Sequence, residues 1–231
     1  MMPPSTLTAA EAIARRRATR RFDPDRPLPV ETLKELLHLA TLAPSGDNLQ
    51  PWRFVVVRSK RNRERLKGCA FGQSKVAEAP AVVIVLGYQR PHETDLEAML
   101  AEAVRRGALT VEAAAATRAT APRSIARAPS PALWATRSAM LAAATLMIAA
   151  ESLGVASAPL EGFDESRLRH EFGVPDDHAV CCLVALGFAA ERKPFPGRFG
   201  LERVCFEEHF GQPWTLGNPS ATEDTEEEKK E

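Results

Sequence analysis

Five arginines lie within the seven residues from Arg15 to Arg21, and this cluster is the part of the sequence that most directly suggests chemistry. A guanidinium group can donate two parallel hydrogen bonds to a phosphate, so converging arginines are typical of a phosphate site. The cluster begins where a predicted helix ends, which lets its side chains converge. The alternative is a solvated basic helix end whose charge complements the helix dipole.

A second segment, residues 43–52, places polar groups between a predicted helix and a predicted strand. The amides of Asn48 and Gln50 can both donate and accept hydrogen bonds, which suits the edge of a heterocycle. Loops held by rigid elements are favoured places for binding groups. The alternative is a turn in which Asp47 and Asn48 only satisfy their own backbone.

A third segment, residues 158–164, brackets the single acid Glu161 between Pro159 and Gly162. Glycine permits close approach of the backbone to a planar ligand. The alternative is a simple connector to a helix capped by Asp164.

Several familiar motifs are missing from the sequence. It contains no G-x-G-x-x-G after a predicted strand, no Walker-type phosphate loop and no G-x-S-x-G elbow. Its four cysteines form no C-x-x-C pair and its five histidines form no H-E-x-x-H, so we expect reduced thiols and no metal site.

The composition is that of an ordinary globular protein. The 231 residues are 45% hydrophobic and 26% charged with a formal net charge of zero, which excludes a mostly disordered chain and argues against a dedicated nucleic-acid binder. The longest apolar stretch, Ala139–Ala150, is too short for the ~20 residues that a bilayer core needs. The N-terminus lacks the features of a signal peptide. We therefore expect a cytoplasmic protein without a membrane segment.

The hydrophobic pattern predicts long helices interleaved with few strands. Because the helical segments cluster over 93–153, the pattern favours an α+β sandwich over a doubly wound sheet. Helices are predicted over 8–17, 30–40, 61–67, 93–106, 110–120, 132–153 and 164–172. Strands are predicted over 53–58, 81–86 and 179–186, with 155–160 as a short strand or loop and 203–206 as a further strand.

Together the three polar segments resemble the flavin-dependent nitroreductase family. Residues 16–22, followed by 43–54, resemble the opening of that family. Residues 153–154, 159–163 and 185–188, with Arg198, resemble its C-terminal half. The order and the spacing both fit from Arg16 to Trp214.

The resemblance implies an FMN-dependent oxidoreductase that passes a hydride from NAD(P)H through FMN to a nitroaromatic, quinone or similar electrophile, by a ping-pong mechanism. It implies an α/β/α sandwich with a mixed sheet flanked by helices, and an intertwined homodimer with two FMN sites at its interface. The expected domain spans residues 1–215, with a variable helical insertion at 92–130 near a pocket roofed by Trp134. Residues 216–231 are expected to be an acidic, disordered tail.

The resemblance also implies roles for particular residues, while FMN rather than a protein side chain carries the chemistry. Arg16, Arg17 and Arg20 would hold the phosphate, joined by Arg198. Pro44, Ser45 and Asn48 would line the flavin ring from the other subunit, with Gln50 as a further candidate. Pro159, Leu160, Glu161 and Gly162 would lie along the opposite ring edge near N5, and Leu160 and Pro44 could provide aliphatic walls. Asn48, Arg20 and Arg53 are candidates for stabilising the reduced ring near N1 and O2.

One position departs from the family. The family often has Ser where this chain has Ala18, which removes one hydroxyl from the phosphate pocket. Neighbouring guanidinium groups can supply donors in its place.

Two other functions stay open. Relatives on this fold dehalogenate, reduce enals or cleave flavin, and the arginines Arg118, Arg123 and Arg127 could favour an anionic acceptor or be solvated. The chain could also be a non-catalytic binder that uses Arg15–Arg21 on nucleic acid or another anionic partner.

Overall fold

The structure, a computed structural model, describes residues 7–191 and 193–214. It divides the chain into two units after Lys193, each described by itself. The single domain expected over 1–215 therefore stays a prediction. The acidic tail expected at 216–231 lies outside the described residues.

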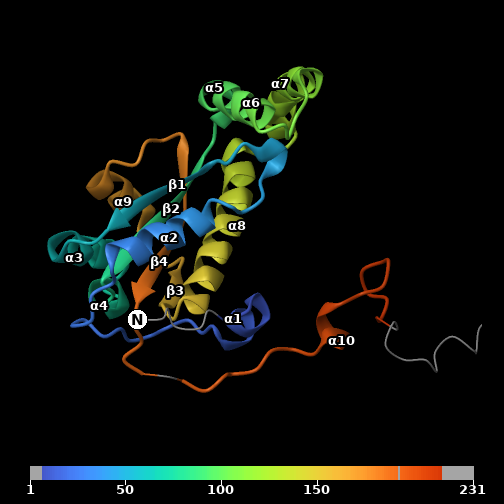
Figure 1. The fold of residues 1–231 in the computed structure, drawn as a ribbon. Coiled ribbons are helices and arrows are strands. Elements are labelled where there is room, and N and C mark those ends of the chain that lie inside the picture. Colours follow the sequence, from blue (N-terminus) through green and yellow to red (C-terminus); the bar gives the residue numbers. More distant parts are fainter. Residues whose placement is uncertain (1–6, 192, 215–231) are drawn as a thin grey trace, which may run out of the picture. The chain divides into compact units, whose positions relative to one another are not determined.

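A four-stranded sheet forms the centre of the first unit (Figure 1). Its strands are β1 (Trp52–Val57), β2 (Ala81–Tyr88), β3 (Ala156–Leu160) and β4 (His178–Gly187). They lie in the order β1-β2-β4-β3, and every neighbouring pair is antiparallel. We expected a mixed sheet, with parallel as well as antiparallel pairs. Among the described residues, the parallel pairing is limited to an isolated bridge between Ala18 and Ser157. The α+β fold is confirmed.

Strand β2 is buried on both faces, as is the C-terminal part of β4 from Cys182 to Gly187. All eight residues of β2 are buried, as the uninterrupted apolar run over 81–86 predicted. Val83 and Val85 face one side of the sheet, and Val82 and Ile84 face the other. The alternation of strand side chains therefore divides the core into two layers.

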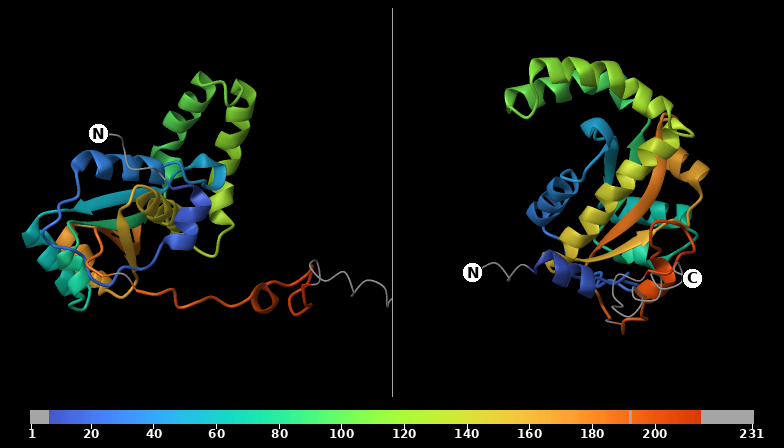
Figure 2. Two further views of the ribbon diagram at one scale, coloured as in Figure 1. Left: turned by 60° about the horizontal axis from the view of Figure 1, so that its bottom comes forward. Right: turned by 90° about the vertical axis from the view of Figure 1, so that its right-hand side faces the viewer.

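Helices cover both faces of the sheet (Figure 2). Helix α8 (Pro131–Ser152) and helix α2 (Val30–Ala40) pack on one face. Helix α3 (Lys60–Cys69), helix α4 (Ser74–Glu78) and helix α9 (Glu165–Phe172) pack on the other. Helix α4 was not predicted, because five residues are too few to show a helical period.

By length and composition helix α8 could cross a membrane, although the apolar stretch 139–150 within it is shorter than a bilayer core needs. Its residues Ala139, Ala142 and Leu146 are fully buried in the core against the sheet. This packing accounts for the apolar residues on the sheet-facing side of α8, whereas Leu133 and Leu141 on other sides of the helix are exposed.

The segment expected to be a variable insertion forms helix α5 (Pro91–Thr94), helix α6 (Leu96–Arg105) and helix α7 (Val111–Ala126). Helices α6 and α7 form a hairpin that extends away from the sheet (Figures 1 and 2). Helix α7 runs through Pro122, which was predicted to begin a connection after a helix ending at 120. Pro122 is exposed, while Ala121 and Ile125 on the same helical turn are buried in the core. Proline has no backbone N–H to donate to the preceding turn of the helix, but the packing of Ala121 and Ile125 keeps the helix continuous.

Helix boundaries follow the capping signals. Helix α1 (Ala9–Arg15) begins with a capping box in which Thr8 and Glu11 bond reciprocally, and the Asp164 carboxylate caps α9. Gly154, with φ of 72°, follows the end of α8.

The strand predicted over 203–206 is wrong. In the second unit, Leu201–Val204 forms the short helix α10, and Phe206 makes only an isolated bridge with Pro213. A short apolar run becomes a strand only when a neighbouring strand accepts its hydrogen bonds.

Candidate functional site

The arginine cluster lies along the edge of β3. After α1 ends, the chain becomes extended and Ala18 forms a parallel bridge with Ser157. The N–H of Thr19 donates to the Ser157 carbonyl at 3.0 Å. Phe22, 2% exposed, then anchors the segment in the core. This edge pairing places Arg16 to Arg20 beside the strand that leads into residues 159–162.

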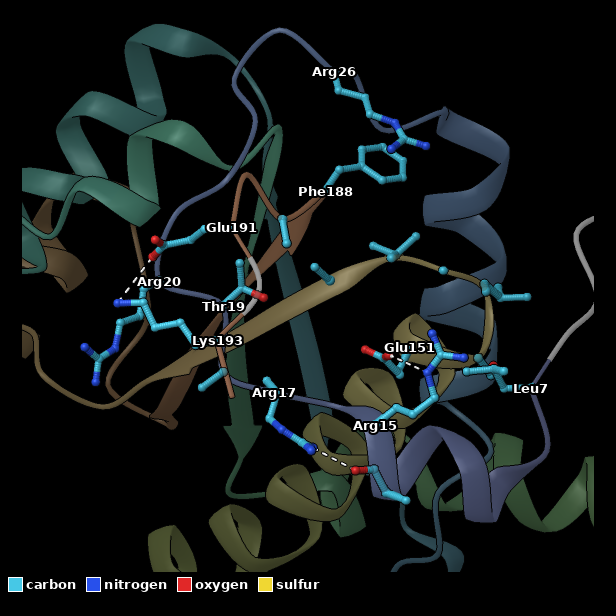
Figure 3. Close-up of a pocket in the computed structure, with 18 residues that line it drawn as sticks. Leu7, Arg15, Arg17, Thr19, Arg20, Arg26, Glu151, Phe188, Glu191 and Lys193 are labelled. Atoms are coloured by element: carbon cyan, nitrogen blue, oxygen red, sulfur yellow. Dashed lines mark hydrogen bonds and ion pairs between the residues drawn. The ribbon is translucent and has the colours of Figure 1, made fainter. Parts of the chain in front are cut away.

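A pocket of about 550 Å³ opens at this edge (Figure 3). Its charged lining comprises five cationic side chains (Arg15, Arg17, Arg20, Arg26, Lys193) and two acidic ones (Glu151, Glu191). Both acids have a cationic neighbour, since Glu151 lies 4.0 Å from Arg15 and Glu191 lies 3.4 Å from Lys193. The cations outnumber the acids, so the pocket suits an anion.

Arg16 follows Arg15 and precedes Arg17 of this lining in the sequence, and it carries an unsatisfied donor. Its Nη1 atom is buried and has no hydrogen-bond partner among the described residues. A buried charged donor without a partner costs free energy that an anionic acceptor would recover. The arginine cluster therefore fits a phosphate.

Residues 159–162 lie at the end of β3 and are held by the loop that follows α3. The Gln73 side-chain amide donates to the Gly162 carbonyl at 2.9 Å, and the Asp164 N–H donates to the Cys69 carbonyl at 2.8 Å. Glu161 and Gly162 are exposed, so their backbone can approach a ligand. The Leu160 side chain is only 4% exposed and packs in the core, so it cannot provide the aliphatic wall that we expected.

The loop over residues 44–50 has a strained backbone. Asp47, Asn48 and Gln50 have φ of 51°, 54° and 46°, a region that residues other than glycine rarely occupy. The Gln50 N–H donates to Ser45 Oγ at 2.9 Å, and Leu49 is buried against the helical hairpin. Such strain clusters at functional sites. Pro44 and Asn48 are exposed on this rigid loop.

The loop and the arginine cluster lie at opposite edges of the sheet. The loop leads into β1, whose Trp52 is level with Gly87 and so with Ala179 of β4. Leu160 of β3 pairs with Leu183. The register therefore separates Trp52 from Leu160 by about 13 Å along the strands and about 14 Å across them. One chain brings residues 16–20 and 159–162 together and leaves residues 44–50 apart.

The sequence profile of the Nitroreductase family matches residues 13–188 of the chain. The chain belongs to the nitroreductase family. A protein from Thermus thermophilus named NADH dehydrogenase is 37% identical over 198 residues, which are 86% of this chain and 95% of the relative.

Solved nitroreductase structures share the fold. A nitroreductase-like protein from Streptococcus mutans is 29% identical with a TM-score of 0.79, over 87% of this chain and 98% of its own. A protein from Exiguobacterium sibiricum, solved in complex with FMN, is 24% identical with a TM-score of 0.81, over 90% and 100% of the two chains. At 24% identity, the similarity to the Exiguobacterium sibiricum protein shows only that the two chains share a fold.

Lys75 is a further cation near the arginine cluster that the sequence did not indicate. Partial burial, and secondarily the charge of Arg20, lower the pKa of Lys75. Lys75 lies on α4, the helix that was not predicted, and no spacing rule relates it to Arg20. Only the folded sheet brings the two cations together.

Three other candidates lie away from this edge. Arg53 forms an ion pair with Asp95 and lies over the Tyr88 ring, near the 44–50 loop rather than the arginine cluster. Trp134 lies beside Gly46 of that loop, 3.6 Å from where a Cβ at residue 46 would be. Arg198 belongs to the second unit, so its part in phosphate binding stays a prediction.

Proposed function

We propose that the chain is an FMN-dependent oxidoreductase that takes electrons from NAD(P)H and reduces a nitroaromatic, quinone or similar electrophile. The observation that carries this proposal is the buried Nη1 of Arg16, which has no partner in the part of the chain that the structure describes and whose neighbour in sequence, Arg17, lines a cationic pocket with Arg20. When bound, FMN supplies the hydride chemistry, and the protein supplies binding, orientation and electrostatics.

The chain's own residues divide the work of binding. Arg16, Arg17 and Arg20 hold the phosphate, and they offset the missing hydroxyl at Ala18. The exposed backbone of Glu161 and Gly162 lies against the reactive edge of the ring. Lys75, which lies near Arg20, adds positive charge at this edge of the site and so favours an anionic ligand there.

In this proposal the functional unit is a homodimer. Pro44, Ser45, Asn48 and Gln50 lie at the edge of the sheet far from the arginine cluster. A second copy of the chain, related by a two-fold axis, can bring its own 44–50 loop to the first chain's pocket. Each of the two sites then draws on both chains.

The cysteines support a location in the reducing cytoplasm. Cys69, Cys181, Cys182 and Cys205 are all free thiols. Burial is the main cause that raises the pKa of Cys182 to about 12, so this thiol stays protonated and unreactive.

The visible absorption spectrum of the purified protein tests the proposal. We expect a yellow protein, or one that takes up added FMN, whose absorbance bleaches when NADH or NADPH is added without oxygen. Turnover with nitroaromatic, quinone and halophenol panels then assigns the acceptor class. Double-reciprocal plots of the initial rate should give parallel lines, because NAD(P)H and the acceptor bind in turn at one pocket. A colourless protein that binds no FMN contradicts the proposal.

A further inference from the structure

The pocket beside the arginine cluster is larger than a phosphate group needs. Its volume is about 550 Å³, whereas a phosphate group is only a few times larger than a water molecule, which occupies about 30 Å³. The lining continues from Arg17 and Arg20 to Arg26 and Phe188 (Figure 3). Within the described chain it does not include residues 159–162, which we expect along the flavin ring. The part of the pocket around Phe188 therefore has room for a second group.

This part of the pocket presents a flat cationic surface. The guanidinium carbon of Arg26 lies 3.6 Å from the centroid of the Phe188 ring, and Arg26 is exposed. The Asp23 N–H donates to the Phe188 carbonyl at 2.8 Å, and Phe22 forms a bridge with Ala189, so the two segments that carry the pair are tied together. A guanidinium held flat on one ring can stack its other face on a further planar group.

The end of α8 completes this part of the pocket. Gly187 pairs with Ala156, so Phe188 is level with Val155, and residues 152–154 at the end of α8 line the same pocket. Helix ends leave backbone carbonyls without intrahelical partners, and such carbonyls can accept from the amino group of a base. Because a helix C-terminus carries partial negative charge, it suits a neutral base better than a phosphate.

The phosphate end and the aromatic end of the pocket are spaced for one nucleotide. Ala18, within the arginine cluster, pairs with Ser157, which is two residues from Val155 along the chain. At about 3.3 Å per residue, this separation is about 7 Å, which a ribose can span between a phosphate and a base.

We propose that the Arg26–Phe188 end of the pocket binds the adenosine of an adenosine phosphate whose phosphate lies on the arginine cluster. Arg26 stacks on the adenine, and Phe188 is a positioning residue that holds the guanidinium flat. Two redox molecules carry this group, FAD and NAD(P)H. The inference rests on the phosphate role that the proposed function gives to the arginine cluster, and it adds a ligand group that FMN lacks.

Binding of AMP and of ribose 5-phosphate to the flavin-free chain tests the base contact, because the two probes differ only in the adenine. Calorimetry should show tighter binding of AMP. Arg26→Lys keeps the charge but loses the planar group, so it should reduce the advantage of AMP roughly 2- to 10-fold, the effect of one lost cation–π contact. Arg61→Gln, on the exposed surface of α3, should leave the advantage unchanged.

Variants of Phe188 test its positioning role. Phe188→Leu should reduce the advantage of AMP, and Phe188→Tyr, which keeps a ring, should retain it. If Phe188 acts through Arg26, then Phe188→Leu should cause no further loss in the Arg26→Lys background. Strictly additive losses contradict the positioning role.

Two measurements on Arg26→Lys identify the molecule that supplies the adenosine. A rise in the ratio of the Kd for FAD to the Kd for FMN assigns the site to FAD. A rise in KM for NADH or NADPH in the FMN-loaded enzyme assigns it to the nicotinamide cofactor. Either result supports the adenosine site.

The outcomes separate this inference from the proposed function. A yellow, FMN-binding enzyme in which AMP binds no more tightly than ribose 5-phosphate overturns this inference alone. A chain that takes up no FMN, yet shows an advantage of AMP that depends on Arg26, overturns the proposed function and leaves the adenosine site in place. A chain that binds neither FMN nor AMP overturns both.

Discussion

Lys75 lies close enough to Arg20 for the guanidinium charge to add to the effect of partial burial, and both lower the pKa of the Lys75 ammonium. A phosphate or reduced ring at this place would reverse the second effect, because a nearby negative charge favours the charged amine. In the proposed site, FMN binding and protonation of Lys75 would therefore be linked.

This linkage predicts a pH dependence of FMN binding. The pKa of Lys75 should be higher in the FMN complex than in the free protein, where it is lowered. The affinity for FMN should therefore fall as the pH rises from the free-protein pKa to the pKa in the complex. The fall should begin below the pH at which an ordinary lysine titrates. Fluorescence titration of FMN against pH measures it. Lys75→Met should bind more weakly and lose this dependence, and an unchanged pH profile in the variant would rule out Lys75 as the linked group.

Replacing Arg16, whose buried Nη1 has no hydrogen-bond partner within residues 7–191 and 193–214, should weaken the phosphate contact selectively. Arg16→Gln is expected to raise the Kd for FMN about 10- to 100-fold, the range for a charge-assisted hydrogen bond, and to change the Kd for riboflavin little. Arg61→Gln, on the exposed surface of α3, is the matched control. Equal losses for FMN and riboflavin would show that Arg16 does not read the phosphate.

Subunit complementation tests the shared site. Arg16→Ala and Asn48→Ala homodimers should each bind FMN poorly. If one chain supplies Arg16 and the other supplies Asn48, refolding the two variants together should restore about a quarter of the sites, because half the dimers are mixed and each holds one intact site. Calorimetric stoichiometry counts them. No recovery in dimers shown by mass to be mixed would place both residues in the same chain's site.

Arg63 should be a stability determinant rather than a ligand. Its guanidinium donates to the carbonyls of Ala77 and Ala79, the latter at 2.6 Å, and to that of Arg58 at 3.1 Å. Arg63→Leu leaves these acceptors unpaired and should lower the free energy of unfolding by about 2 kcal/mol. Urea unfolding measures the change. Arg61→Leu, two residues away on the exposed surface of α3, should change it little.

Gly187, the last residue of β4, should tolerate no side chain. A Cβ there would lie 2.4 Å from Cδ of Pro80 and 3.1 Å from Cδ1 of Phe22. Gly187→Ala should therefore destabilise the protein by about 1–3 kcal/mol through overpacking. In Gly68→Ala the new Cβ meets the end of the flexible Arg167 side chain, which can move. Equal thermal shifts for the two variants would contradict this steric account.

Local signals in the sequence predicted much of the fold. Thr8 with Glu11 marked the start of α1, Asp164 marked the start of α9, and the unbroken apolar run marked β2. These signals succeed because a cap or a buried strand is decided by residues close together in sequence.

The remaining features depend on contacts between distant segments. Pro122 continues a helix because Ala121 and Ile125 are anchored in a core that forms only after folding. Leu160 faces the core because of its register with Leu183, which no local pattern reveals. Strand order also decides that residues 44–50 lie far from the arginine cluster.

The backbone pairing of Ala18 with Ser157 has a further consequence for solubility. Without residues 16–20, β3 would present a bare row of N–H and C=O groups, which is a template for adding a strand from another molecule. The arginine cluster covers part of that row, and its charges repel a second copy of the same segment. The segment that we expect to hold the phosphate thus also protects the sheet against aggregation, and variants that loosen it should be judged for solubility as well as for binding.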